Sequence, residues 1–184
     1  GVRRAMPNSQ PRSVTYSNPL GSTLCQLSEA VYLAERPFYP RLPGMQGTDV
    51  ASKASIVKLR DGGLFVHSPV ELDASLKEEL ASLGPVKHIV SPNSEHVKFA
   101  QTWIDAFPDA TAYAAPGLRE RFPDIRWHRE IGEEDELPEA LASEFDVAWI
   151  EPERAPFKLL GDRPFFSEIV FCHRPSRALF VTDL

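Results

Sequence analysis

Cysteine is scarce in this sequence: two of its 184 residues are cysteines, at positions 25 and 172. Two thiols are too few for a disulfide framework of the kind that stabilises small secreted domains. Cys25 and Cys172 both lie in apolar segments, so we expect them to be buried free thiols. Thiols persist in the reducing cytoplasm, which makes a cytoplasmic location the expectation.

Basic residues are outnumbered, and long apolar runs are missing. Lysine and arginine total 20 against 26 aspartates and glutamates, for a net charge of -6 and a pI near 5.4. A nucleic-acid-binding domain normally carries a basic face, so this class is not expected. No apolar run approaches the roughly 20 residues that span a bilayer, and the first residues lack the apolar core of a signal peptide. We therefore expect no membrane partner and a small-molecule substrate or ligand.

Proline, in contrast, is abundant, with 17 residues that divide the chain into short elements. Residues 1–22 are polar and proline-containing, which predicts a flexible N-terminal arm. Residues 23–184 are numerous enough to bury one core, so we expect a single domain there.

Periodic segments predict an α/β fold with mixed sheets. Two apolar runs, residues 55–59 and 64–68, flank Gly62-Gly63 and predict a β-hairpin. Residues 73–83 predict a helix that Asp73 caps and Gly84 ends. Further strands are predicted over residues 86–91, 111–115, 145–150, 168–173 and 177–182, and further helices over residues 95–107 and 118–122. Strands that alternate with helices in the middle, with hairpins at both ends, are typical of a layered α/β protein.

The segment Ser91-Pro-Asn-Ser-Glu-His96 carries the main chemical signal. An apolar strand ends there in a polar loop, and a carboxylate stands beside an imidazole. Many metal-dependent hydrolases place ligands at such a turn, because the strand end holds the backbone while side chains converge. Ser91 and Asn93 nevertheless stand where a metal site requires histidines.

Three separated blocks, residues 56–69, 83–93 and 176–184, resemble the DUF4336 family of the metallo-β-lactamase-like superfamily. The resemblance implies a metallo-β-lactamase-like αββα layered sandwich. It also implies more chain after Asp183-Leu184, so we expect a fold shortened at its C-terminus.

The resemblance also implies which residues form the site. The superfamily pattern His-x-His-x-Asp-His falls on residues 91–96, where His96 is retained and Glu95 replaces the aspartate. The metal-bridging aspartate corresponds to Asp183, and Glu168 offers another carboxylate. The implied ligands of a single divalent metal, such as zinc, are His96, Glu168 and Asp183, and the implied catalytic residues are Glu95, His96 and Asp183. A metal-free site is the favoured alternative, and a two-metal site is not expected with Ser91 and Asn93 present.

The other histidines carry weaker signals. His67 and His88 lie within strand patterns and are expected to be sheet residues, His128 a surface residue, and His173 to point away from the site. The Gly-x-Ser-x-Gly motif is absent, and no Ser-His-Asp arrangement can be recognised.

We therefore predict a metallo-β-lactamase-like protein with a degenerate metal site, a hydrolase relative that acts on a small molecule without metal or with one metal. A non-hydrolytic descendant, of isomerase or lyase type, would use the same pocket. The alternative is a non-catalytic binding or assembly protein that forms a homodimer through an open sheet edge.

Overall fold

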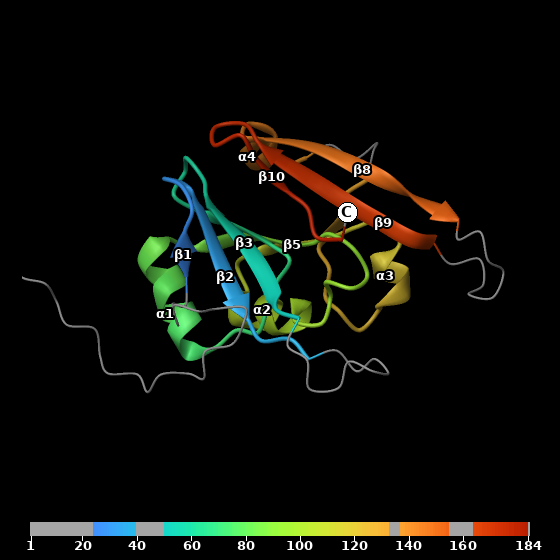
Figure 1. Cartoon of the computed structure of the whole chain (residues 1–184), viewed down its shortest axis with the longest axis horizontal. Coiled ribbons are helices and arrows are strands. Elements are labelled where there is room, and N and C mark those ends of the chain that lie inside the picture. Colours follow the sequence, from blue (N-terminus) through green and yellow to red (C-terminus); the bar gives the residue numbers. More distant parts are fainter. Residues whose placement is uncertain (1–23, 40–49, 133–136, 155–163, 184) are drawn as a thin grey trace, which may run out of the picture.

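The computed structural model describes residues 24–39, 50–132, 137–154 and 164–183. The predicted arm, residues 1–22, lies outside these ranges. Two β-sheets and four helices make up the described part (Figure 1).

The larger sheet has seven strands in sequential order. They are β1 (Cys25–Gln26), β2 (Val31–Arg36), β3 (Ser52–Lys58), β4 (Leu64–His67), β5 (Val86–Ser91), β6 (Thr111–Ala114) and β7 (Arg129–Glu130). The first four strands pair antiparallel, whereas β4 to β7 pair parallel. The predicted hairpin is confirmed as β3 and β4, with Gly62 at a φ of +82° in its turn. Because β4 and β5 are parallel, their carboxyl ends lie at the same sheet edge.

The smaller sheet is antiparallel and covers one face of the larger sheet. Its strands are β8 (Phe145–Arg154), β9 (Pro164–His173) and β10 (Ala178–Phe180), in the order β10-β9-β8. The core between the sheets is aromatic: the Phe65 ring centroid lies 4.5 Å from that of Phe145 and 5.1 Å from that of Phe171. Strand alternation explains this layer, because Phe65 faces the small sheet while its neighbours Leu64 and Val66 face the other way.

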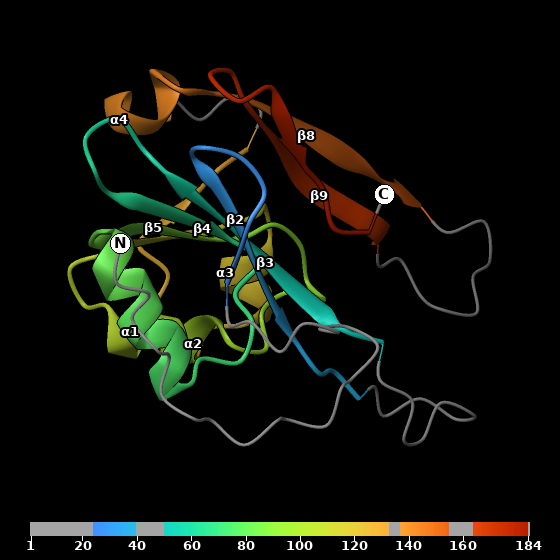
Figure 2. The ribbon, with the colours of Figure 1, turned by 60° about the vertical axis from the view of Figure 1, so that its left-hand side comes forward.

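The other face of the large sheet packs against helices α1 (Ala74–Leu83) and α2 (Ala100–Ala106), as Figures 1 and 2 show. Asp73 caps α1 by accepting from the Leu76 N–H at 2.8 Å, as predicted. A Cβ on Gly84, at the end of α1, would lie 2.2 Å from the Gly62 carbonyl oxygen, so only glycine fits there. Helices on one face and a second sheet on the other confirm the predicted layered α/β class.

The remaining helices are short: α3 spans Leu118–Arg121 and α4 spans Glu139–Ala142. Three sequence predictions are wrong in detail. Residues 94–99 form bends and turns, and α2 begins only at Ala100. The last strand ends at Phe180 and leaves Thr182 and Asp183 in a loop. Cys25 is exposed on the edge strand β1, and Cys172 is half-buried on β9.

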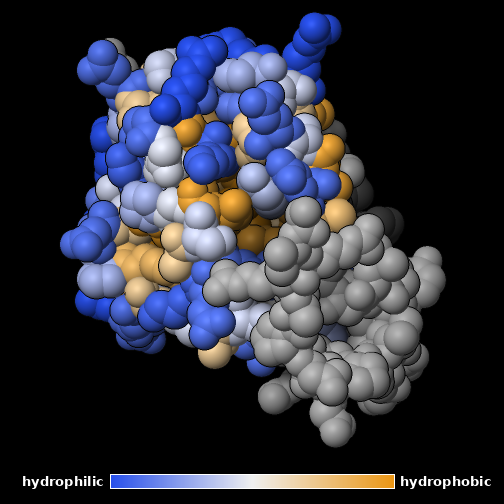
Figure 3. Space-filling view, turned by 90° about the vertical axis from the view of Figure 1, so that its left-hand side faces the viewer, coloured by the Kyte–Doolittle hydropathy of each residue, from blue (hydrophilic) through white to orange (hydrophobic). Residues whose placement is uncertain are grey.

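Hydrophilic residues cover most of the face in Figure 3, and apolar residues come to the surface in its middle. None of the helices within the described ranges is long and apolar enough to cross a membrane.

Candidate functional site

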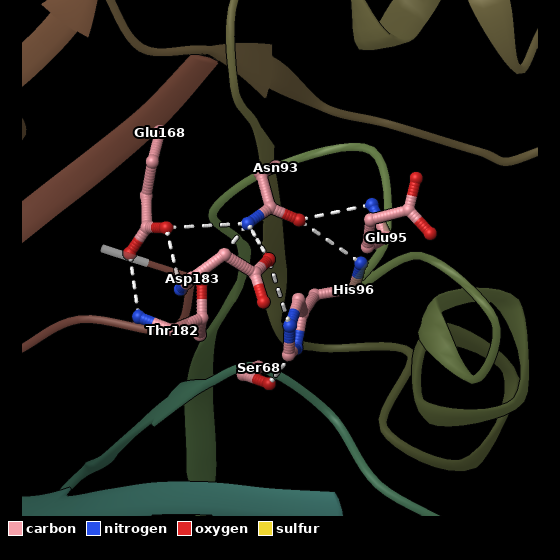
Figure 4. A network of polar contacts seen from close by, with 7 residues as sticks. All are labelled: Ser68, Asn93, Glu95, His96, Glu168, Thr182 and Asp183. Carbon is pink, nitrogen blue, oxygen red and sulfur yellow. Dashed lines mark hydrogen bonds and ion pairs between the residues drawn. The ribbon is translucent and has the colours of Figure 1, made fainter. Parts of the chain in front are cut away.

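The site forms where three segments meet beyond the ends of the central strands. Ser68 directly follows β4, and its N–H donates to the Val90 carbonyl of β5 at 2.9 Å. The loop after β5 is hydrogen-bonded to β9 of the small sheet, because the Ile169 N–H donates to the Pro92 carbonyl at 3.0 Å. Residues that follow β10 complete the cluster from the third side (Figure 4).

Asn93 is the centre of this cluster. Its Oδ1 accepts from the N–H groups of Glu95 (2.9 Å) and His96 (3.2 Å). Two backbone donors require an acceptor there, so the amide orientation follows from its partners and Nδ2 must point the other way. The Nδ2 hydrogens are shared among Asp183 Oδ2 (2.6 Å), Thr182 Oγ1 (2.9 Å) and Glu168 Oε2 (3.3 Å). The Asn93 side chain therefore links the loop after β5 to the segment after β10.

Glu168 holds that last segment in place from β9. Its side chain is buried, and its two carboxylate oxygens accept from the N–H groups of Thr182 (2.6 Å) and Asp183 (2.9 Å). The buried carboxylate thus accepts hydrogen bonds from three donors of this cluster, which offsets the cost of taking it out of water. Glu168 therefore fixes the position of the backbone at Thr182 and Asp183.

His96 lies between a hydroxyl and a carboxylate. Its Nδ1 is 2.6 Å from Ser68 Oγ, and its Nε2 is 3.2 Å from Asp183 Oδ2. The hydrogen bond from His96 lowers the pKa of Asp183. The positive charge of protonated His96 and the hydrogen bond from Asn93 also lower this pKa, whereas burial raises it. Because the ionised carboxylate only accepts, Nε2 carries the hydrogen in the neutral form of His96, and the Nδ1 lone pair then accepts from the Ser68 hydroxyl. The result is a Ser68–His96–Asp183 relay, which the sequence prediction missed.

This relay faces a cavity of about 650 Å³. The apolar part of the wall consists of Leu33, Phe38, Val50, Phe99 and Val181, among others. Two lysines line it as well: Lys53 pairs with Glu35 at 3.2 Å, whereas the Lys98 ammonium lies 4.6 Å from the Phe38 ring centroid and 4.9 Å from that of Phe99. A cavity of this volume, with apolar walls and a few polar groups, is typical of a small-molecule site.

Glu95, the third predicted catalytic residue, lies at the rim of this cavity. Its side chain is exposed, and in Figure 4 its carboxylate points away from Asp183 and Asn93. The structure therefore brings His96, Glu168 and Asp183 into one cluster and leaves Glu95 outside it.

The donor set of this cluster does not fit a metal ion. A metal requires lone pairs that converge on one point, but an N–H donor, Asn93 Nδ2, lies among the carboxylates of Asp183 and Glu168. Both ring nitrogens of His96 already have partners. Within the described ranges, no three His, Cys, Asp or Glu side chains are arranged to hold a metal.

The remaining histidines lie outside the relay. His67 is buried in the sheet as predicted, and burial, with a smaller contribution from the nearby His96 charge, lowers its pKa to about 3. His88 Nδ1 lies 3.1 Å from the Tyr113 hydroxyl, and burial lowers the His88 pKa. His128 is exposed, as predicted.

His173 is turned away from the site, as predicted. Its Nδ1 lies 2.7 Å from Ser176 Oγ, and its Nε2 lies 3.4 Å from Glu144 Oε2. Ser91, which stands at one of the two positions where the superfamily pattern has histidine, is fully buried.

Ser68 and Thr182 are the site residues that sequence reasoning did not find. A usable signal existed, because Ser68 follows β4 and Asn93 follows β5. Once these strands are taken as parallel neighbours, both residues must lie at one sheet edge.

The fold places the chain among metallo-β-lactamase-like structures. DIM-1 metallo-β-lactamase exposed to ceftazidime is 15% identical, with a TM-score of 0.59 over 85% of this chain and 67% of that chain. The metallo-β-lactamase from Pontibacter korlensis is 14% identical, with a TM-score of 0.60 over 88% and 73%. The FIM-1 enzyme from Pseudomonas aeruginosa, in its mono-zinc form, is 12% identical, with a TM-score of 0.54 over 81% and 63%. These similarities establish the fold.

The family is established by sequence. Residues 41–184 match the model described as "Domain of unknown function (DUF4336)", and the chain belongs to that family. No curated protein matches the chain.

Proposed function

We propose that this protein is a small-molecule hydrolase that has replaced the metal centre of its fold with a hydrogen-bonded imidazole. The observation that carries the proposal is the position of His96 between Ser68 Oγ (2.6 Å) and Asp183 Oδ2 (3.2 Å) at the wall of a cavity. A general base requires an available lone pair and a partner that stabilises its positive charge after proton transfer. His96 has both.

In this proposal the surrounding residues position the base. Asp183 holds the hydrogen on His96 Nε2, and Asn93 and Glu168 hold Asp183. Asn93 also holds the His96 backbone N–H, so the same side chain orients the base and its carboxylate. Hydrolysis then begins when His96 Nδ1 removes a proton from an oxygen nucleophile in the cavity.

The cavity wall supports a substrate with an apolar body and an anionic group. The aromatic rings of Phe38 and Phe99 provide apolar surface, and the Lys98 ammonium above them has no carboxylate partner among the described residues. Acyl esters, lactones and related compounds that carry a carboxylate fit this description.

The test measures hydrolysis of a panel of such acyl compounds in the presence of EDTA. His96→Gln is compared with the wild type, and His128→Gln, a change at an exposed histidine, is the matched control. Loss of a general base predicts a fall in kcat of about 10²- to 10⁴-fold for His96→Gln only. Loss of wild-type activity in EDTA, or full activity in folded His96→Gln, would contradict the proposal.

A second candidate function is assembly, which the exposed apolar side chains of the small sheet favour. Leu179 of β10 is 63% exposed and Ile150 of β8 is 39% exposed. A second copy that packs on this sheet would cover both. Light scattering tests this role: a monomer at all concentrations contradicts it, whereas a dimer that Leu179→Lys dissociates supports it.

A further inference from the structure

We propose that Ser68 is a covalent nucleophile, so that hydrolysis proceeds through an acyl intermediate on Ser68 Oγ. This inference rests on the proposed function, since it assigns the oxygen that His96 deprotonates. The alternative within that function is direct attack by water. Three features of Ser68 favour the covalent route.

The first feature is its distance from the base. Ser68 Oγ is 2.6 Å from His96 Nδ1, although the two residues are 28 positions apart in the sequence. Nucleophile and base must lie within hydrogen-bond distance, with the base oriented by a third group. Asp183 is that group, and Figure 4 shows the three side chains in one line of contacts.

The second feature is the backbone of Ser68. Its φ is +60°, in the left-handed region that residues other than glycine seldom adopt and that costs about 1–2 kcal/mol. β4 ends at His67, so the chain turns sharply at Ser68, and the next residue, Pro69, cannot continue the sheet. Backbone strain at a polar residue of a cavity wall is typical of functional sites, because the turn directs the side chain.

The third feature is the environment of the hydroxyl. Ser68 is 2% exposed and yet lines the cavity, so its oxygen lies at the cavity wall rather than in bulk water. Exclusion of water strengthens the hydrogen bonds of the relay. The His96 side chain is more accessible, with 26% of its surface exposed, and its Nδ1 lies within hydrogen-bond distance of the Ser68 hydroxyl.

The proposed steps balance. Ser68 Oγ attacks the substrate carbonyl carbon, its proton moves to His96 Nδ1, and the carbonyl electron pair moves to oxygen. Collapse of the tetrahedral intermediate breaks the bond to the leaving group, which takes the proton from His96. Water then attacks the acyl-Ser68 ester with its proton moving to His96, and Ser68 Oγ leaves with that proton. The net reaction consumes one water and needs no other reactant.

The chain provides its own control in a second trio of the same kind. Ser176 Oγ lies 2.7 Å from His173 Nδ1, and His173 Nε2 lies 3.4 Å from Glu144 Oε2, beside a cavity of about 470 Å³. Ser176 is three residues from His173 in the β9–β10 turn, so the turn itself accounts for their contact. Ser176 itself does not have a positive φ; in its turn the residue with a positive φ is Arg177, at 56°.

The experiment treats the full chain with a fluorophosphonate probe, which phosphonylates activated serines, and maps the adduct by peptide mass spectrometry. We expect one adduct, on Ser68, that is retained in Ser176→Ala and lost in His96→Gln. With an acyl substrate, Ser68→Ala is expected to lower kcat at least about 10³-fold. Mapping the adduct on the wild type does not depend on how the variants fold.

Other results overturn the inference. An unlabelled Ser68 in the wild type, an adduct on Ser176 instead, or an unchanged kcat in Ser68→Ala each contradicts it. If His96→Gln abolishes hydrolysis while Ser68→Ala does not, water is the nucleophile and the proposed function stands without the covalent step. If neither variant loses activity, both proposals fail.

Discussion

The amide nitrogen of Asn93 lies 2.6 Å from Asp183 Oδ2, within a cluster where the resemblance to metallo-β-lactamases predicts a metal ion. Like a cation, the amide group offers the neighbouring carboxylates a positively polarised partner, because its hydrogens donate to them. It also does what a cation cannot, because its oxygen accepts two backbone hydrogen bonds from the same loop. The two ends of the Asn93 amide therefore connect the loop after β5 to the segment after β10.

Removal of the Asn93 amide is expected to destabilise the protein. Asn93→Ala leaves the Asp183 and Glu168 carboxylates and two backbone N–H groups without this partner, and we expect the free energy of unfolding to fall by about 3 kcal/mol. Urea denaturation measures the change. A loss below about 1 kcal/mol would show that the amide does not hold the cluster together.

Asn93→Asp is expected to create a cation site. The substitution retains an acceptor for the backbone but places a third carboxyl group beside those of Glu168 and Asp183, near His96. Like charges repel, so the variant is less stable than the wild type in EDTA, and Mn²⁺ or Zn²⁺ raises its Tm. The wild type is the control, and an equal metal-induced rise in its Tm would contradict the account.

Asp183→Asn tests the carboxylate of the relay. The asparagine amide can donate to His96 Nε2 and favour the tautomer that cannot accept from Ser68, so we expect kcat to fall about 10²- to 10⁴-fold. The pKa of Asp183 is lowered, so its pairing stabilises the folded state above the ordinary value of 3.8 and this contribution is lost as the pH falls through the lowered pKa. The stability difference between wild type and variant should therefore shrink in acid. A constant difference at all pH values would argue against the ion pair.

Lys98 is expected to select anionic substrates. Its ammonium lies over Phe38 and Phe99 at the cavity, and Lys98→Met preserves the length of the apolar side chain while it removes the charge. We expect KM for a carboxylate-bearing ester to rise about 10-fold, with KM for a neutral ester unchanged and kcat for both retained. Equal effects on both esters would remove the electrostatic explanation.

The sequence predicted the scaffold better than the site. Local signals were sufficient for the β3–β4 hairpin and for α1, where Asp73 and Gly84 mark the ends. These features depend on residues close together in the chain.

The site depends instead on contacts between distant residues. Ser68 reaches His96 because β4 and β5 are parallel neighbours, and no spacing rule connects either residue to Asp183. The predicted start of a helix near Glu95 was wrong: Asn93 Oδ1 accepts from the N–H groups of Glu95 and His96, but α2 begins only at Ala100. Cys25 was predicted to be buried but is exposed, because it lies on a two-residue edge strand.

His67 is expected to make the fold sensitive to acid. Burial lowers its pKa from 6.5 to about 3, so below pH 6.5 the unfolded chain binds a proton that the folded chain does not. Its contribution to stability therefore falls by up to about 1.4 kcal/mol per pH unit from pH 6.5 down to about pH 3. His67→Leu removes this contribution, and urea titrations at pH 7.5 and pH 5 should show a smaller loss for the variant than for the wild type. Equal losses would mean that His67 is protonated in the folded state.

The metal content of the wild-type protein, purified without chelator, tests the central claim most directly. If the amide of Asn93 has replaced the metal centre, inductively coupled plasma mass spectrometry will find no stoichiometric divalent metal in the wild type. The Asn93→Asp variant, prepared in the same way, will contain one metal ion per chain. A wild-type protein that carries one metal ion per chain and loses it on His96→Ala would contradict the account.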